Sequence, residues 1–305
     1  MPKNLRHEAY LVLGSVFFAL SSIPAKLIME SGLSAWRLTE IRSTGAFLIM
    51  FLYVFIRNRK GLRTTKSELP TLIAFGVIGF ATVNALYFLA IARLNVSIAL
   101  IIEFTAPIWI ALWMRFIQKK NVSKLMWWGL AIGFTGLLLV GQVWRGLTLD
   151  GLGLIYAFVD SFALGLYFIV GEKLVRSKSS DVTMAWGFGV SSAFFAIIFP
   201  WWSFPFEVFG NSIQLSGRFA GTSLPGWLLI AWVIIGGTAL PYFFVLTGLK
   251  GLSAATSSVI GMLEPIFGGL FAWFFLFEKL TLMQFVGACV VMIGIFLANR
   301  ARTSV

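Results

Sequence analysis

Four ionisable residues lie inside long apolar segments of this chain, where a charge is costly. Three are carboxylic acids, Glu103, Asp160 and Glu264, and the fourth is Arg42. A charged side chain at the centre of a membrane helix costs about 2.5–3.5 kcal/mol, so such residues usually face a cavity or an opposite charge. Each carboxyl group could therefore bind a substrate amine or a coupling proton. The alternative is a structural carboxyl group, either neutral or paired with Arg42 or Lys26.

Polar and aromatic residues in the same segments extend the candidate site. We expect Asn84, Tyr87 and Tyr242 to supply hydrogen-bonding groups, and Trp109 to line a cavity. Most aromatic side chains of membrane proteins instead serve packing or the belt at the membrane surface. Further aromatics that could line the cavity are Tyr156, Tyr167 and Trp186.

Four prolines lie within the apolar segments and are expected to kink or break their helices, because proline lacks a backbone N–H and clashes with the preceding turn: Pro24, Pro107, Pro241 and Pro265. Glu103 and Pro107 are four residues apart, so they share a helix face. The segment that contains Glu264 carries a stripe of small residues that allows close helix approach: Ala254, Ser257, Gly261, Gly268 and Ala272. We expect both faces to point towards a common centre.

The composition places these residues in a polytopic membrane protein. Of the 305 residues, 59% are hydrophobic and 12% are charged, and the mean hydropathy is +0.90. An average soluble domain has about 25% charged residues. A membrane-spanning helix needs about 20 apolar residues. Apolar segments of this length predict an all-α protein with ten transmembrane helices, at 9–29, 36–56, 70–92, 95–117, 123–143, 150–172, 182–202, 225–248, 252–276 and 280–299.

The distribution of basic residues predicts the orientation of the chain. Most Lys and Arg residues lie before the first span, between alternate pairs of spans and after the last span, whereas the other loops hold few, among them Arg145. Positive charge marks the cytoplasmic side of a membrane protein. We therefore expect a multi-pass protein of the cell (inner) membrane with both termini in the cytoplasm. The net charge of +12 then reflects topology and lipid headgroup contacts, not binding of nucleic acid.

Several chemistries lack the residues that they need. The chain has one cysteine, Cys289, and one histidine, His7, so neither a disulfide nor a His/Cys metal site is expected. No phosphate-binding glycine loop is present, which argues against ATP hydrolysis. We expect no cofactor. An intramembrane enzyme lacks a second midplane Asp to partner Asp160, and a channel would need a continuous polar stripe that is not visible.

An internal repeat suggests how the spans are organised. Residues 94–140 align without a gap on residues 252–298, and identical pairs include Pro107/Pro265, Gly129/Gly287 and Gly136/Gly294. The repeat divides the chain into residues 1–143 and 150–299, with five spans each. An odd number of spans inverts the second half, an architecture characteristic of secondary transporters. The glycines indicate tight helix packing, either within one chain or across a homodimer.

These features resemble the EamA family of the drug/metabolite transporter superfamily. The resemblance rests on LSAA at 252–255, LEPI at 263–266 and FEKLT at 277–281, with LNVS at 94–97 and API at 106–108 in the first half. Arg42, in EIR at 40–42, matches an arginine that this family often carries. The sequence QKKN at 118–121 departs from the family's usual Gly-Glu-Arg-like turn.

The resemblance implies a secondary carrier that works by alternating access on a small-molecule substrate. Members of the family export amino acids and other metabolites, and some import. We therefore expect an exporter of amino acids or related compounds. An importer of a small polar metabolite is the alternative, and a channel or an intramembrane enzyme has less support in the sequence.

Overall fold

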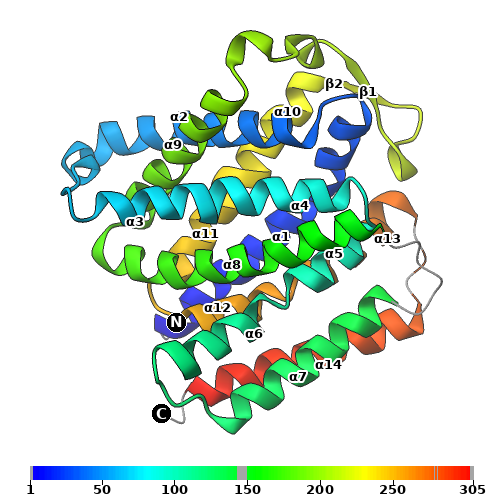
Figure 1. The fold of residues 1–305 in the computed structure, drawn as a ribbon. Coiled ribbons are helices and arrows are strands. Elements are labelled where there is room, and N and C mark those ends of the chain that lie inside the picture. The colour runs from blue at the N-terminus through cyan, green and yellow to red at the C-terminus, as the bar shows by residue number, and fades with distance from the viewer. Residues whose placement is uncertain (1–2, 143–149, 278, 280, 303–305) are drawn as a thin grey trace.

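The computed structural model describes residues 3–142, 150–277, 279 and 281–302 (Figure 1). Arg145, and Glu278 and Leu280 of the FEKLT sequence, lie outside the described residues. Ten helical segments in the described residues are long and apolar enough to cross a membrane. The all-α class and the ten predicted spans are therefore confirmed.

The first repeat contains spans one to five. They are formed by α1 (Lys3–Glu30), α2 (Ala35–Asn58), α3 (Leu69–Ala74) with α4 (Val83–Ile91), α5 (Val96–Glu103) with α6 (Ala106–Leu112), and α7 (Lys124–Gly141). The second repeat contains spans six to ten. They are formed by α8 (Gly151–Ser177), α9 (Ser180–Ile198), α10 (Gly226–Ile234) with α11 (Leu240–Gly248), α12 (Ala254–Gly261) with α13 (Glu264–Leu276), and α14 (Leu282–Arg302).

Side chains at the helix starts fix several of these boundaries. Ser34, Ser123 and Ser253 each accept a hydrogen bond from a backbone N–H of the helix that they precede. Asp150 does the same for α8, and this bond from Gly153 lowers the pKa of Asp150. Such caps satisfy backbone donors that have no partner in the first turn. The seventh span is shorter than predicted: α9 ends at Ile198 instead of 202, two residues before Pro200.

Both repeats contain the same two irregularities. Spans three and eight each pass through a π-helical segment, Phe75–Thr82 and Ile235–Ala239. Spans four and nine break, at residues 104–105 and 262–263, and Pro107 and Pro265 then occupy the second position of α6 and α13. Pro241 is the second residue of α11, directly after a π-helical segment. Pro24 lies inside α1, which continues through it.

Glycines in α7 and α14 demonstrate the inverted relation of the repeats. A Cβ atom at Gly136 would lie 2.8 Å from the carbonyl oxygen of Gly287, and one at Gly129 would lie 2.9 Å from that of Gly294. The residue numbers rise along one helix as they fall along the other, so the helices are antiparallel. In the repeat, position 129 corresponds to position 287, and position 136 to position 294. The symmetry of the repeat therefore converts the Gly129–Gly294 contact into the Gly136–Gly287 contact. These glycines pack within one chain.

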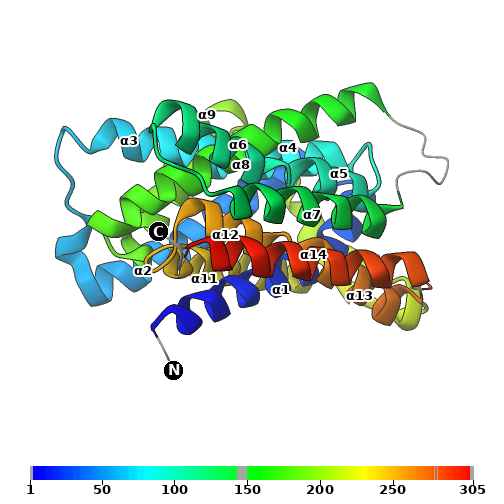
Figure 2. The same cartoon turned by 90° about the horizontal axis from the view of Figure 1, so that it is seen from below.

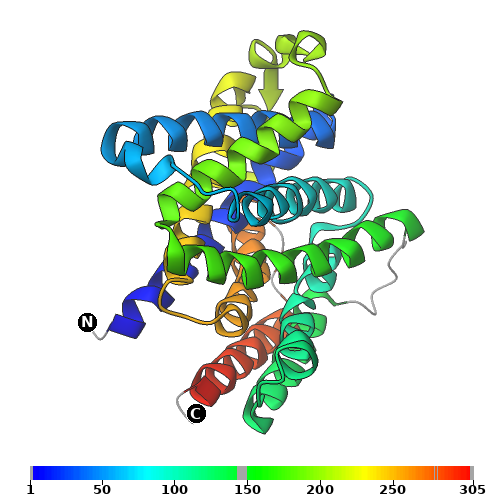
Figure 3. The same ribbon diagram turned by 60° about the vertical axis from the view of Figure 1, so that its left-hand side comes forward.

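A second antiparallel pair is formed by α2 and α9. Trp36 near the start of α2 contacts Phe199 after the end of α9, with ring centres 5.7 Å apart, whereas further along α2 the hydroxyl groups of Ser43 and Ser191 are 2.9 Å apart. Figures 1 and 3 place this pair at one edge of the bundle and the α7–α14 pair at the other. The remaining six spans lie between the two pairs.

The ten crossings bring both ends of the described chain to one end of the bundle, which we call the terminal face (Figure 2). The opposite face carries the long segment 199–225, with an antiparallel hairpin of β1 (Ser212–Gln214) and β2 (Ser223–Pro225). Phe204, Val208 and Ile213 of this segment are buried in a cluster with the ends of α1 and α2. This apolar cluster therefore covers the opposite end of the bundle.

Candidate functional site

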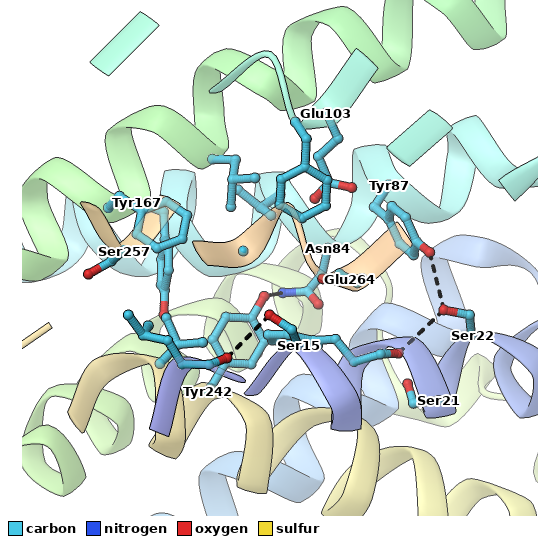
Figure 4. Close-up of a pocket in the computed structure, with 18 of the residues that line it drawn as sticks. Ser15, Ser21, Ser22, Asn84, Tyr87, Glu103, Tyr167, Tyr242, Ser257 and Glu264 are labelled. Atoms are coloured by element: carbon cyan, nitrogen blue, oxygen red, sulfur yellow. Dashed lines mark hydrogen bonds between the residues drawn. The ribbon is translucent and has the colours of Figure 1, made fainter. Parts of the chain in front are cut away.

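A cavity lies in the middle of the bundle and is lined by seven of the ten spans (Figure 4). Spans one to four contribute from the first repeat, and spans six, eight and nine from the second. Its charged lining residues are Arg42, Glu103 and Glu264. Its other polar lining residues are Ser15, Ser21, Ser22, Asn84, Tyr87, Tyr167, Tyr242 and Ser257. The rest of the wall is largely apolar, so the cavity can enclose a small molecule and orient it through few polar groups.

A hydrogen bond between the two repeats marks the centre of the cavity. The Asn84 side-chain amide donates to the Tyr242 hydroxyl at 2.8 Å and to the Phe80 carbonyl oxygen at 2.7 Å. Asn84 and Tyr242 are 158 residues apart, the same offset that relates the repeats, so they occupy equivalent positions. The axis that relates the repeats therefore passes close to this bond. Both residues follow the π-helical segments of their spans.

The helix breaks of spans four and nine carry the two cavity carboxyl groups. Glu103 is the last residue of α5, and its side chain is buried, with 9% exposure. Its Oε2 atom has no hydrogen-bond partner among the described residues. Glu264 is the first residue of α13 and is partly exposed. Within the described part of the chain, neither carboxyl group forms an ion pair.

Arg42 is held by span eight and not by a carboxylate. Its Nε atom donates to the Thr238 hydroxyl and its Nη2 atom to the Gly237 carbonyl oxygen, both at 2.7 Å. The guanidinium also lies 4.6 Å from the ring centre of Phe88. Lys26, the other proposed partner of Glu103, lies 4.0 Å from Glu30 at the surface. The described residues therefore do not contain the ion pair of the paired structural alternative for Glu103, and a neutral structural carboxyl group is still the alternative to a functional one.

Two of the predicted site residues do not line the cavity. Asp160 is 1% exposed on α8, and neither of its carboxyl oxygens has a partner among the described residues. The Trp109 ring Nε1 donates to Ser161 at 3.1 Å, so this residue connects α6 to α8. Asp160 is therefore behind the wall, and Trp109 is at a helix contact.

Sequence reasoning did not select five polar residues of the wall as site residues. Ser15, Ser21 and Ser22 come from α1, where the seven-residue spacing of Ser15 and Ser22 places these two on one face of the helix. This spacing was a usable signal. Tyr167 and Ser257 also line the cavity. From the sequence, Tyr167 is one of three further aromatics that could line it, and Ser257 is a member of the small-residue stripe of span nine.

The inverted repeats, the broken helices in spans four and nine, and the polar cavity at their axis define a class of protein. Secondary transporters place their substrate sites at the interface of inverted repeats, where discontinuous helices meet. The fold and the site are therefore those of a membrane transporter. Comparisons with known proteins agree with this class and give the family.

The sequence profile of the EamA-like transporter family matches residues 6–142 and 151–300, and the chain belongs to this family. An uncharacterized transporter of Archaeoglobus fulgidus is 24% identical over 294 residues, which are 96% of each chain. The threonine/homoserine exporter RhtA of Salmonella typhimurium is 27% identical over 234 residues, covering 75% of this chain and 71% of that protein. A crystal structure with 16% identity covers 97% of this chain and 96% of its own, with a TM-score of 0.71.

Proposed function

We propose that this protein is a secondary active exporter of zwitterionic amino acids or closely related metabolites. One observation carries the proposal: the cavity presents a guanidinium, Arg42, and two carboxyl groups, Glu103 and Glu264, that form no ion pair with one another in the described residues. A zwitterion has the complementary charges. Arg42 would bind the substrate carboxylate, and the two glutamates would bind its ammonium group. The similarity to a threonine/homoserine exporter supports both the substrate class and the direction.

Alternating access follows from the inverted repeats. Residues 1–143 and 150–299 form two units that exchange roles, so that the cavity opens to the terminal face in one state and to the opposite face in the other. We place the terminal face in the cytoplasm and the protein in the inner membrane. The basic residues between spans two and three lie on that face and support this orientation: Arg57, Arg59, Lys60, Arg63 and Lys66.

The carboxyl groups also suggest how transport is driven. Glu103 and Glu264 line the same cavity, and two neighbouring carboxylates repel each other when both are ionised. A proton and the ammonium group of a substrate would then compete for the same carboxyl groups. Exchange of an outgoing amino acid for an incoming proton is the coupling that we propose. Transport, and not catalysis, is the role that this site supports, and it needs no cofactor.

Partners other than the substrate are few in this proposal. The substrate site is complete within one chain, because both repeats contribute to it. The glycines of α7 and α14 were candidates for a homodimer contact, but they pack against each other within one chain. Membrane lipid is the remaining partner, since large apolar side chains such as Ile56, Ile197 and Phe296 are exposed on the bundle surface.

A ligand screen tests the proposed substrate class. Purified protein is heated with amino acids, purines or sugars at several pH values, and the shift in melting temperature is measured. We expect stabilisation by one or more amino acids only. The methyl ester and the N-acetyl derivative of the same amino acid should not stabilise the protein, because each lacks one of the two charges. Stabilisation by a sugar or a purine instead would contradict the proposal.

A further inference from the structure

We propose that Tyr167 and Ser257 form a hydroxyl-binding subsite, which selects amino acids whose side chain carries a hydroxyl group. This inference rests on the proposed transport of amino acids. Both residues line the central cavity, and both are buried, with exposures of 2% and 0%. Neither hydroxyl oxygen has a hydrogen-bond partner among the described residues.

The Tyr167 ring is fixed by its neighbours, while its hydroxyl group remains available. The ring stacks on Phe75 with a centroid distance of 5.5 Å, and it makes edge contacts with Phe80 and Tyr242. The other two tyrosines of the cavity wall use their hydroxyl groups: Tyr242 accepts from Asn84, and the hydroxyl of Tyr87 lies 3.4 Å from that of Ser22. Tyr167 is therefore a preorganised group without a protein partner in the described chain.

Ser257 differs from Ser15 and Ser22 of the cavity wall in the same respect. A serine inside a helix commonly donates to the carbonyl oxygen four residues earlier. Ser15 and Ser22 form this bond, to Leu11 and Phe18. Ser257 does not, although it lies within the regular helix α12. Its hydroxyl group is thus not satisfied by its own helix.

The two hydroxyl groups lie away from the Arg42 end of the cavity. Tyr167 is in the second half of α8 and Ser257 is near the start of α12, so both belong to the half nearer the terminal face. Arg42 and Ser22 belong to the other half. Figure 4 shows Tyr167 and Ser257 at one end of the view, and Tyr87 and Ser22 at the other. A substrate bound by its carboxylate at Arg42 would therefore extend its side chain towards Tyr167 and Ser257.

The cavity wall around the Tyr167 and Ser257 hydroxyl groups is apolar, so this subsite should favour a substrate side chain with a hydroxyl group over an apolar one. Leu164, Phe168 and Val245 line the same half of the cavity. A substrate hydroxyl group can accept from one protein hydroxyl and donate to the other. An apolar side chain of the same shape would leave both unpaired, which costs more than the bond itself gains.

Threonine and valine test this inference, because they have the same shape and differ by one hydroxyl group. Transport of labelled L-threonine and L-valine is measured in proteoliposomes that contain the wild type, Tyr167→Phe, Ser257→Ala or the double variant. We expect the wild type to prefer threonine by about tenfold or more in kcat/KM. Each single variant should reduce this preference, and the double variant should bring it close to one.

A matched control removes a hydroxyl group that has no partner but lies outside the cavity. Thr247 meets this description, since its Oγ1 atom is unpartnered among the described residues and it does not line the cavity. Thr247→Val should keep the threonine preference of the wild type. Melting temperatures of all variants show whether each one is folded.

The outcomes separate this inference from the proposed function. If no amino acid is bound or transported, the proposed function fails. If amino acids are transported but the wild type treats threonine and valine alike, only the hydroxyl subsite is refuted. Transport of other amino acids without competition by threonine would refute the subsite as well, and so would a preference that persists in the double variant.

Discussion

Glu103 ends α5 at the break of span four, and no ion pair in the described residues depends on it. Glu103→Gln keeps the shape and the hydrogen-bonding capacity of the side chain but removes the charge that would bind an ammonium group or a proton. A hydrogen bond to a charged group is worth about 1.5–3 kcal/mol, so substrate binding should weaken by about 10- to 150-fold. The melting temperature should stay near that of the wild type. Transport and thermal unfolding in parallel measure both effects.

Glu30→Gln is the matched control for Glu103→Gln, because Glu30 is an exposed carboxylate that interacts only with Lys26 in the described chain. It should leave transport and melting temperature unchanged. Normal transport by Glu103→Gln would remove Glu103 from the mechanism and leave Glu264 and Asp160 as candidates. A large loss of stability instead would show that Glu103 is structural.

Replacement of Arg42 by lysine should weaken substrate binding, although both side chains carry a positive charge. Its guanidinium donates to Thr238 and to Gly237 at once, which a lysine ammonium on a flexible stem cannot reproduce with the same geometry. Arg42→Lys should therefore reduce the affinity for an amino acid by about tenfold or more, measured by titration of the ligand-induced melting shift. Arg218→Lys is the control, because Arg218 also donates to a carbonyl oxygen, that of Phe274, but lies outside the cavity. An unchanged affinity in Arg42→Lys would contradict its role.

The sequence identified the charged centre of the cavity better than its walls. Arg42, Glu103 and Glu264 are costly in a membrane span, so their presence alone points to a cavity. Asp160 satisfied the same criterion but lies behind the wall, because the depth of a residue in a span does not determine which way its helix is rotated. Trp109 follows the break at residues 104–105. Helical spacing from Glu103 therefore does not determine which way the Trp109 side chain points.

At the scale of helices, the contact between α7 and α14 gives a direct test of the packing. Gly136→Val would place a Cβ atom about 2.5 Å from the backbone nitrogen of Val291, which cannot move without displacing α14. Overpacking of this kind costs about 1–3 kcal/mol, so the melting temperature should fall. Gly268→Ala is the control, since nothing lies within 4 Å of its added Cβ atom. Equal melting temperatures for the two variants would contradict the described contact.

An ion pair at the terminal face connects the segment before α3 to the end of α8. The Thr65 N–H, Lys178 and the Thr64 hydroxyl group donate to Glu68, and together they lower the pKa of Glu68 to about 2. The unfolded value is about 4.3. A lowered pKa means that the stabilisation is present above about pH 4.3 and is lost as the pH falls towards 2.

Glu68→Gln should therefore lower the melting temperature slightly at pH 7, and the difference from the wild type should shrink below pH 4. The melting temperatures of both proteins across this range test the prediction. A difference that is independent of pH would contradict the role of the carboxylate charge.

The sequence predicted the spans and the breaks in spans four and nine, because length, hydropathy and proline act locally. The π-helical segments in spans three and eight were not predicted. Their residues, such as FGVIGFAT at 75–82, are almost uniformly apolar and show no signal of altered winding. In the structure Thr82 and Thr238 each donate to the carbonyl oxygen five residues earlier. These bonds depend on the local winding and not on composition.

For the whole molecule, the topology can be tested without knowledge of the substrate. A reporter fused after residue 305 should give a cytoplasmic signal, because the terminal face carries most of the positive charge. A reporter inserted at Gly221, which is exposed in the loop on the opposite face, should give an external signal. Equal signals at the two positions would contradict the orientation that we propose.

The repeat was visible in the sequence because proline and glycine are required where helices break or touch. The central hydrogen bond between Asn84 and Tyr242 was not, although both residues were selected. Because the two residues differ in type, an alignment of the two repeats by residue identity does not show that they are equivalent. Only the folded chain shows that equivalent positions of the two repeats meet at the centre.

Counterflow in proteoliposomes tests amino-acid transport by alternating access most directly, because it requires a carrier that opens to one side at a time. Vesicles containing the purified protein are loaded with an unlabelled amino acid that stabilises it, and the labelled form is added outside at low concentration. We expect label to accumulate transiently above its equilibrium level in vesicles with the wild type, but not with Glu103→Gln or without protein. Label that equilibrates without an overshoot would indicate a channel. The absence of any uptake would contradict amino-acid transport.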